Sequence, residues 1–129
     1  MIRKVLVLFA TIAVLYSHLN PALAQVYSNG VYTLTCNSSG LALDNEGATG
    51  GNYPVWQWSP MAGNVNQKWM ISSLGNGYYT LICMRSGMAL DTNGKTSNGS
   101  VLVQNPVQQN NLDQQWSITS GGRFTLFRT

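Results

Sequence analysis

Short stretches of alternating apolar and polar residues, separated by turns rich in Gly and Asn, follow one another from residue 27 onward. Tyr32, Leu34 and Cys36 alternate with polar residues, so they fall on one face of an expected strand. In the first half of the chain the pattern predicts strands at residues 31–36, 40–44, 55–58 and 68–72. After residue 25, no window has the spacing of an amphipathic helix. Short strands between frequent turns predict an all-β barrel or sandwich.

The whole pattern occurs twice, at a constant offset of 47 residues. The residues that recur at this offset are the pairs Tyr32/Tyr79, Leu34/Leu81, Cys36/Cys83, Gly40/Gly87, Leu43/Leu90, Asp44/Asp91, Gln57/Gln104, Asn64/Asn111, Gln67/Gln114, Trp69/Trp116 and Ile71/Ile118. So many matches without a gap indicate a duplicated unit. Repeat one spans about residues 31–77 and repeat two about residues 78–123. Phe124-Thr125-Leu126 matches Tyr79-Thr80-Leu81, which predicts that residues 124–129 begin a third repeat.

Residues 1–24 have the three parts of a signal peptide. Arg3 and Lys4 give a positive start, residues 5–15 form an apolar run, and Ala22-Leu23-Ala24 supplies small residues where a signal peptidase reads. We therefore expect cleavage before Gln25 and export of residues 25–129 as one secreted, extracellular domain. The alternative is a membrane anchor, which is disfavoured because the apolar run is short for a bilayer.

Composition excludes several kinds of site from the expected mature chain. The one histidine, His18, lies in the signal peptide, so neither a Ser-His-Asp arrangement nor a histidine metal site can form after cleavage. Loss of Arg3 and Lys4 lowers the formal net charge from +3 to +1, and the remaining basic residues are scattered. This argues against nucleic acid and membrane insertion. We expect no cofactor, no metal and no enzymatic activity.

Two Gln-x-Trp triplets carry a resemblance to a known family. Gln67-Lys68-Trp69 and Gln114-Gln115-Trp116 lie at the repeat offset, and each follows an Ala-Leu-Asp sequence at the same distance. This combination resembles the ricin B-chain lectin family over about residues 27–129. The resemblance implies a β-trefoil, here incomplete: two repeats plus the first strand of a third. It also implies a module that binds glycans, of galactose or xylan type, without catalysis.

In this family a shallow pocket on one repeat holds the sugar, and the resemblance carries its residues over by position. In repeat one they are Asp44, Trp58, Asn66 and Gln67. The Asp accepts hydrogen bonds from sugar hydroxyls, the ring stacks on the sugar, and the Asn completes the polar clamp. In repeat two they are Asp91, Asn105, Asp113 and Gln114. Because Asn105 offers no ring, we expect the second site to be weak or inactive.

The same residues also have a structural interpretation. The tryptophans of the two triplets are expected in the core, and their glutamines are expected to hydrogen-bond to backbone there. Asp44 and Asp91 could be turn formers only, although Trp58 and Asn66 favour function for Asp44. The equivalent cysteines of the two first strands could form a disulfide, with two small buried thiols slightly favoured.

Two other functions stay open. A trefoil of this kind could be a protein-interaction module, of an inhibitor or toxin-subunit type, with inactive sugar pockets. Exposure of Trp58 beside Asp44 would favour sugar, and burial would favour protein contact. A glycoside hydrolase is least favoured, because only four carboxylates are available for its acid pair.

The partial third repeat leaves the predicted barrel without its last strands, and unpaired strand edges are unfavourable. The chain could be a truncated product, it could form an oligomer to complete the barrel, or Phe124-Thr125-Leu126 could seal the edge alone. We favour the first.

Overall fold

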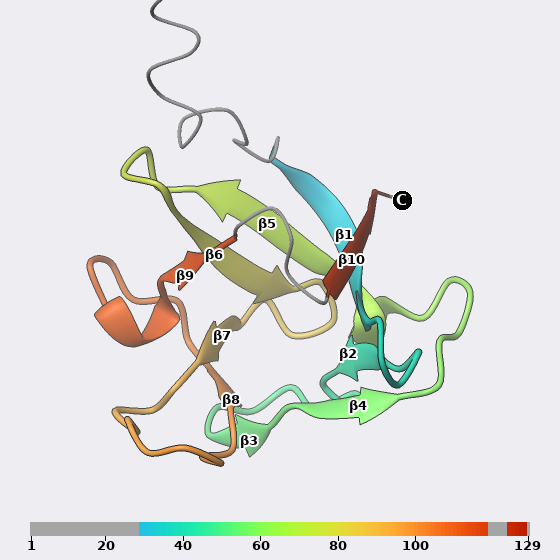
Figure 1. Ribbon diagram of the computed structural model, residues 1–129. Coiled ribbons are helices and arrows are strands. Elements are labelled where there is room, and N and C mark those ends of the chain that lie inside the picture. Colours follow the sequence, from blue (N-terminus) through green and yellow to red (C-terminus); the bar gives the residue numbers. More distant parts are fainter. Residues whose placement is uncertain (1–28, 119–123, 129) are drawn as a thin grey trace, which may run out of the picture.

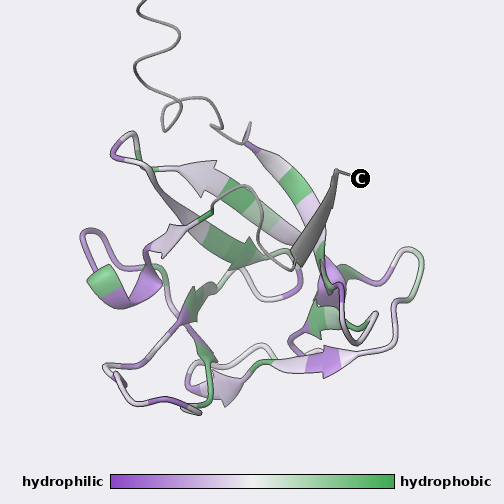
Figure 2. Ribbon diagram, viewed as in Figure 1, coloured by the Kyte–Doolittle hydropathy of each residue, from purple (hydrophilic) through white to green (hydrophobic). Residues whose placement is uncertain are grey.

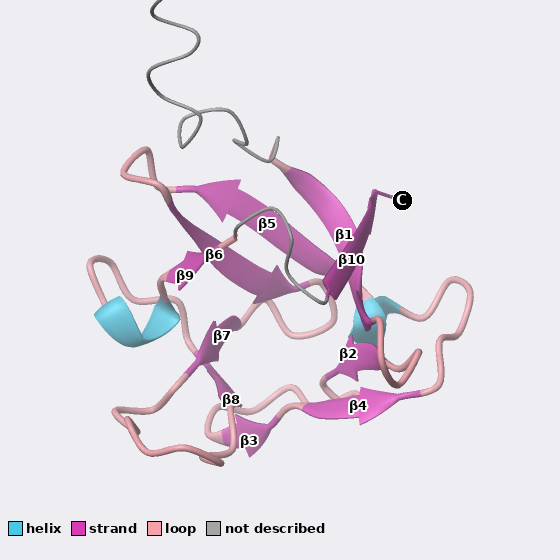
Figure 3. Cartoon of the chain, in the orientation of Figure 1, coloured by secondary structure: helices cyan, strands magenta, loops and turns pink. Residues whose placement is uncertain are grey.

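The computed structural model describes residues 29–118 and the backbone of residues 124–128. The predicted signal peptide, residues 1–24, lies outside these ranges. The regular elements within them are short strands and two 3-10 turns (Figure 3). In chain order they are β1 (Gly30–Cys36), β2 (Ala42–Asp44), β3 (Tyr53–Pro54), β4 (Trp56–Trp58), η2 (Val65–Gln67), β5 (Trp69–Ser73), β6 (Tyr78–Cys83), β7 (Ala89–Asp91), β8 (Val103–Asn105), η3 (Leu112–Gln114), β9 (Trp116–Ser117) and β10 (Phe124–Arg128). This described part contains no helix that could span a bilayer.

Apart from β3, which has no counterpart among the described elements of repeat two, the two repeats fold into the same elements in the same order. The elements β1, β2, β4, η2 and β5 of repeat one correspond to β6, β7, β8, η3 and β9 of repeat two. The four strands predicted for repeat one are confirmed, as β1, β2, β4 and β5. β5 pairs with both β1 and β6, so the long strands of the two repeats lie side by side in an antiparallel, barrel-like sheet (Figure 1). The pairs β2–β4 and β7–β8 lie beyond one end of these strands.

A strand is also found where the third repeat was predicted to begin. β10 pairs with β1, and Leu126 lies opposite Leu34. Between β5 and β6, Ile71 lies opposite Leu81 in the same way. Relative to β1, β10 thus takes the place that the last strand of one repeat takes relative to the first strand of the next. One edge of β1 is therefore covered, while β9 and β10 are not paired with each other in the described residues.

The core is formed by side chains that alternate along the long strands, which carry apolar bands in Figure 2. Its buried members are Tyr32, Val55, Trp69, Ile71, Tyr79, Leu81, Cys83 and Leu90. Trp69 is fully buried, as predicted, whereas Trp116 is half-buried against the core. The indole N–H groups of both tryptophans donate to equivalent carbonyls, Leu43 O at 3.0 Å and Leu90 O at 3.1 Å. The hydrogen bonding of the duplicated units is therefore repeated as well as their strands.

Both cysteines are free thiols, which confirms the thiol alternative over the disulfide, but only one of the two is buried as predicted. Cys83 is buried, and this burial raises the pKa of its thiol. Cys36 is half-buried, and hydrogen bonds from Ser39 and then Ser38 lower its pKa to about 7. The two equivalent thiols therefore differ in acidity.

Candidate carbohydrate-binding site

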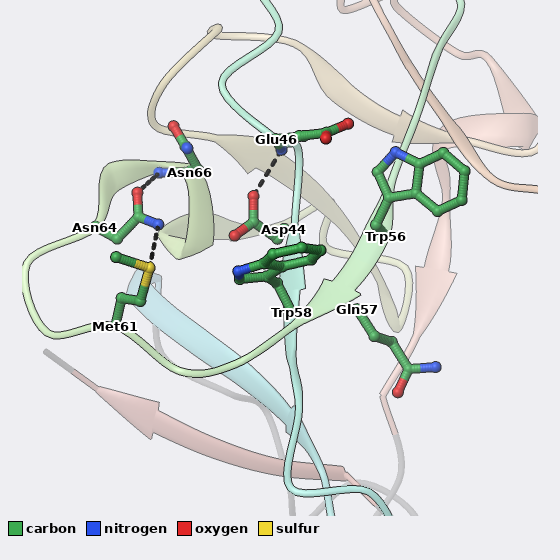
Figure 4. Close-up of a pocket in the computed structure, with 8 residues that line it drawn as sticks. All are labelled: Asp44, Glu46, Trp56, Gln57, Trp58, Met61, Asn64 and Asn66. Carbon is green, nitrogen blue, oxygen red and sulfur yellow. Dashed lines mark hydrogen bonds between the residues drawn. The ribbon is translucent and has the colours of Figure 1, made fainter.

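A pocket of about 610 Å³ lies on repeat one (Figure 4). Its walls come from β2, β4, the turn after β2 and the segment that leads into η2. The residues that line it are Asp44, Glu46, Trp56, Gln57, Trp58, Met61, Asn64 and Asn66. Indole rings beside carboxylates and amides suit a ligand that has both hydroxyl groups and an apolar face.

The pairing of β2 with β4 puts Asp44 and two tryptophans on one face. Asp44 lies opposite Trp56, and Ala42 lies opposite Trp58. Because side chains alternate along a strand, these four point to the same side and Gln57 points to the other. Figure 4 shows the Trp58 ring beside the Asp44 carboxylate, the Trp56 ring farther along β4 on the side of Glu46, and Gln57 extending away from the carboxylate. Trp58 is 59% exposed, so its ring is free to contact a ligand.

Asp44 is only 4% exposed and is held by two hydrogen bonds. Its Oδ1 accepts from the backbone N–H of Glu46 at 2.6 Å, and its Oδ2 accepts from Gln67 Nε2 at 2.8 Å. Gln67 also donates to Ser59 O and accepts from the Met61 N–H, each at 2.9 Å. Gln67 thus belongs to the buried frame behind the pocket, in agreement with its structural interpretation. It orients Asp44 rather than lining the pocket.

Two asparagines of the η2 segment form another wall. Asn64 caps η2, since its Oδ1 accepts from the Asn66 N–H at 3.1 Å. The Asn66 amide lies beside Gly47 and makes no side-chain hydrogen bond with any described residue. Both the N–H and the C=O groups of the Asn66 amide are therefore available to hydrogen-bond with a ligand at the rim.

Glu46 occupies the turn after β2 in a conformation that few side chains adopt. Its φ is +56°, in the left-handed region, where Asn, Asp and Gly are tolerated best. Its Oε2 accepts from the Tyr53 hydroxyl at 3.2 Å, and this bond, together with the charge of Glu46, raises the pKa of Tyr53. The carboxylate is thereby held at the pocket, and its Oε1 has no partner among the described residues.

Repeat two keeps the buried frame. Gln114 Nε2 donates to Asp91 Oδ2 at 2.8 Å and to Pro106 O at 3.0 Å. Its Oε1 accepts from the Gln108 N–H at 3.0 Å. Asp91 and Gln114 therefore reproduce the pair formed by the corresponding residues of repeat one, and both are buried.

Repeat two does not keep the pocket lining. Asp113 accepts from the Thr92 hydroxyl at 2.7 Å and from the Gly94 N–H at 3.1 Å, so both of its carboxylate oxygens bind the turn that follows β7. Asn105 Oδ1 accepts from the Asn52 N–H of repeat one at 2.7 Å. Each residue predicted for the weaker site thus makes a side-chain hydrogen bond within the protein, and none of them supplies an aromatic ring.

Three of the four residues predicted for repeat one line the pocket together: Asp44, Trp58 and Asn66. Sequence-based prediction did not point to the other lining residues, Glu46, Trp56, Gln57, Met61 and Asn64. For Trp56 a signal was present, because a residue two positions before Trp58 shares its face of the predicted strand. For Glu46 the signal in the sequence would have been a departure from the repeat, because the equivalent position of repeat two is Asn93.

Comparison with known proteins identifies relatives of this arrangement. The model of the family described as ricin-type beta-trefoil lectin domain-like matches residues 23–105. Among solved structures, the designed threefold-symmetric protein ThreeFoil is 36% identical with a TM-score of 0.68, and the match covers 77% of this chain and 72% of that chain. An exo-β-1,3-galactanase from Clostridium thermocellum is 26% identical with a TM-score of 0.66, covering 81% of this chain but only 23% of the galactanase. A ricin B-like lectin from Macrolepiota procera, solved in complex with lactose, is 22% identical with a TM-score of 0.58, covering 81% of this chain and 72% of that chain. No curated protein matches, while the structural matches confirm the predicted all-β, trefoil-like fold.

Proposed function

The chain belongs to the ricin-type β-trefoil lectin family, and from this premise we propose that it is a secreted carbohydrate-binding module whose glycan site is the pocket of repeat one. The proposed ligands are galactose-type or xylan-type glycans, bound without catalysis. Export follows from the predicted signal peptide and would leave Gln25 as the first residue. N-terminal sequencing of protein recovered from the culture medium tests that part: retention of residues 1–24 would contradict it.

The exposure of Trp58 beside Asp44 carries the proposal. An indole ring in contact with water is unfavourable unless it has a partner, and the C–H face of a pyranose is a suitable one. A protein-interaction module with an inactive pocket would more naturally have this ring buried. The exposure of Trp58 therefore supports a carbohydrate-binding module over a protein-interaction module.

The polar groups of the pocket suit the hydroxyl groups of a sugar that stacks on Trp58. Asp44 is fixed by its two N–H donors, yet each carboxylate oxygen can accept a further hydrogen bond, and such charge-assisted bonds are strong. Asn66 adds a donor and an acceptor on the facing wall. Because the frame holds Asp44 before any ligand arrives, little ordering is needed on binding.

The test is titration calorimetry of the mature protein with galactose, lactose, xylose and xylobiose. Trp58→Ala should lower the affinity for the sugar that binds by about tenfold, since one stacked ring contributes about 1–1.5 kcal/mol. Tyr78→Ala is the matched control, because Tyr78 is an exposed aromatic residue on β6 that does not line the pocket. Absence of binding for all four sugars, or an unchanged affinity of Trp58→Ala, would contradict the assignment.

A further inference from the structure

Trp56 is a second exposed ring in the same pocket. It lies two residues before Trp58 on β4, so the two Cα atoms are about 7 Å apart and both rings point to the same side. Trp56 is 49% exposed, whereas Val103, its equivalent in repeat two, is 4% exposed. The fold therefore accepts a small buried residue at this position, and neither the strand nor the core explains an exposed indole there.

Glu46 adds a carboxylate on the side of Trp56. Figure 4 shows its side chain extending from the turn after β2 toward that ring. Repeat two places Asn93 at the same turn position, with φ +54° against +56° for Glu46. Asn tolerates this conformation well, whereas Glu does not, so Glu46 carries a backbone strain of the kind found at ligand-binding positions.

Tyr53 holds the Glu46 carboxylate in place. The Tyr53 hydroxyl donates to Oε2 of Glu46, which leaves Oε1 of Glu46 available to accept a hydrogen bond from a ligand. The group formed by Glu46, Tyr53 and Trp56 thus has the same two ingredients as the group formed by Asp44 and Trp58: a fixed carboxylate and an exposed ring. Glu46 and Trp56 line the same pocket as Asp44 and Trp58, while Tyr53 supports Glu46 from outside that lining.

We propose that Trp56 and Glu46 form a second sugar subsite next to that of Asp44 and Trp58, so that the natural ligand is an oligosaccharide of at least two units. This inference rests on the proposed function and specifies its ligand class. One unit stacks on Trp58 and bonds to Asp44, and the next unit stacks on Trp56 and bonds to Glu46. The pocket volume of about 610 Å³ lies well within the range of clefts that enclose ligands larger than one hexose.

The experiment compares each monosaccharide with its disaccharide on the mature protein: galactose with lactose, and xylose with xylobiose. For the pair that binds, the disaccharide should bind about tenfold more tightly, which is the effect of one additional stacked ring. Trp56→Ala should remove this advantage while changing the monosaccharide affinity by less than about twofold. Trp56→Phe should retain most of the advantage, because it keeps a ring.

Glu46→Gln tests the carboxylate separately. It keeps the size of the side chain but removes the charge, so the disaccharide affinity should fall by about threefold to tenfold and the monosaccharide affinity should not change. Tyr78→Ala again serves as the control. Urea unfolding of each variant shows that it is folded.

The outcomes separate the two proposals. If the monosaccharide binds in a Trp58-dependent manner but Trp56→Ala leaves the disaccharide affinity unchanged, the second subsite is wrong and the proposed function stands. Equal losses for both sugars in Trp56→Ala would also overturn the second subsite, since the ring would then serve the first unit. If the unmodified protein binds none of the four sugars, both proposals fail.

Discussion

Repeat one and repeat two have the same buried frame and different rims. In each, a glutamine amide joins a buried Asp at 2.8 Å, and an indole N–H binds the carbonyl next to that Asp. At the rim, Trp58 of repeat one corresponds to Asn105, which already binds the other repeat. The shared frame indicates that the Asp–Gln pair serves the fold, whereas the proposed ligand binding depends on a few exposed residues at the rim of repeat one.

The largest expected difference between the repeats is in stability, and it concerns Gln104 and Gln57, which occupy equivalent positions in the two repeats. Gln104 is fully buried: its Oε1 accepts from Asn45 at 3.0 Å, and its Nε2 donates to Gly50 O at 2.8 Å. Gln57 is exposed and accepts one bond, from the Ser39 hydroxyl at 2.9 Å. Gln104→Ala should lower the free energy of unfolding by about 3 kcal/mol, because it leaves several buried polar groups without partners.

Gln57→Ala provides the matched control for that prediction. Because its side chain is exposed, the substitution should change the free energy of unfolding by less than about 0.5 kcal/mol. Urea unfolding, followed by tryptophan fluorescence, measures both variants. Similar losses in the two variants would mean that Gln57 has a buried environment in solution, and the proposed difference between the repeats would be wrong.

A smaller effect distinguishes Asn66 from Asp113. Asn66→Ala should weaken sugar binding by about fivefold, the effect of one hydrogen bond, without changing stability. Asp113→Ala should do the opposite: it removes the acceptor of Thr92 and Gly94, so stability should fall by about 1–2 kcal/mol while sugar affinity is unchanged. Calorimetry and urea unfolding of both variants test this. Weaker sugar binding by Asp113→Ala would show that repeat two also has a working site.

The smallest effect concerns the equivalent thiols and leaves binding unchanged. The thiolate is the reactive form, so the reaction of Cys36 with iodoacetamide should accelerate as the pH rises through about 7, the lowered pKa of this group. Cys83, whose pKa is raised by burial, should stay unreacted in the folded protein over the same range. Mass spectrometry after timed labelling distinguishes the two sites. Labelling of both at equal rates would contradict the difference in environment.

Much of the fold could be predicted from the sequence, because the repeats appear as local patterns of apolar and polar residues. The 47-residue offset and the alternation along 31–36 predict strands that the structure confirms in position. The short strand β3 was not predicted, since its pairing partner is β8 of the other repeat. The pair Gln57 and Gln104 shows the limit most clearly. Identical residues at identical positions differ in burial because only one of them has a neighbouring repeat packed against it.

The place of Trp58 in the pocket was predictable, because a ring at that distance after Asp44 belongs to the family pattern. Glu46 and Trp56 belong to no such pattern, and their place in the pocket depends on a left-handed backbone at Glu46 and on the pairing that sets the two rings beside Asp44's strand. Side chains that depart from a repeat are visible in sequence, and alternation shows which of them share a strand face, but the sequence does not show which face lines a pocket.

The bonds from Gln104 also decide which part of this chain an engineer could transplant. The turn that carries Asn45 and Glu46 belongs to repeat one by sequence, yet the carbonyls of Ala48 and Gly50 are held by repeat two. A cut between the repeats would leave the pocket turn without its support. The smallest unit that keeps the pocket turn supported is therefore repeat one together with β8 and the strands that place β8, and any library built on the pocket should keep Gln104 constant.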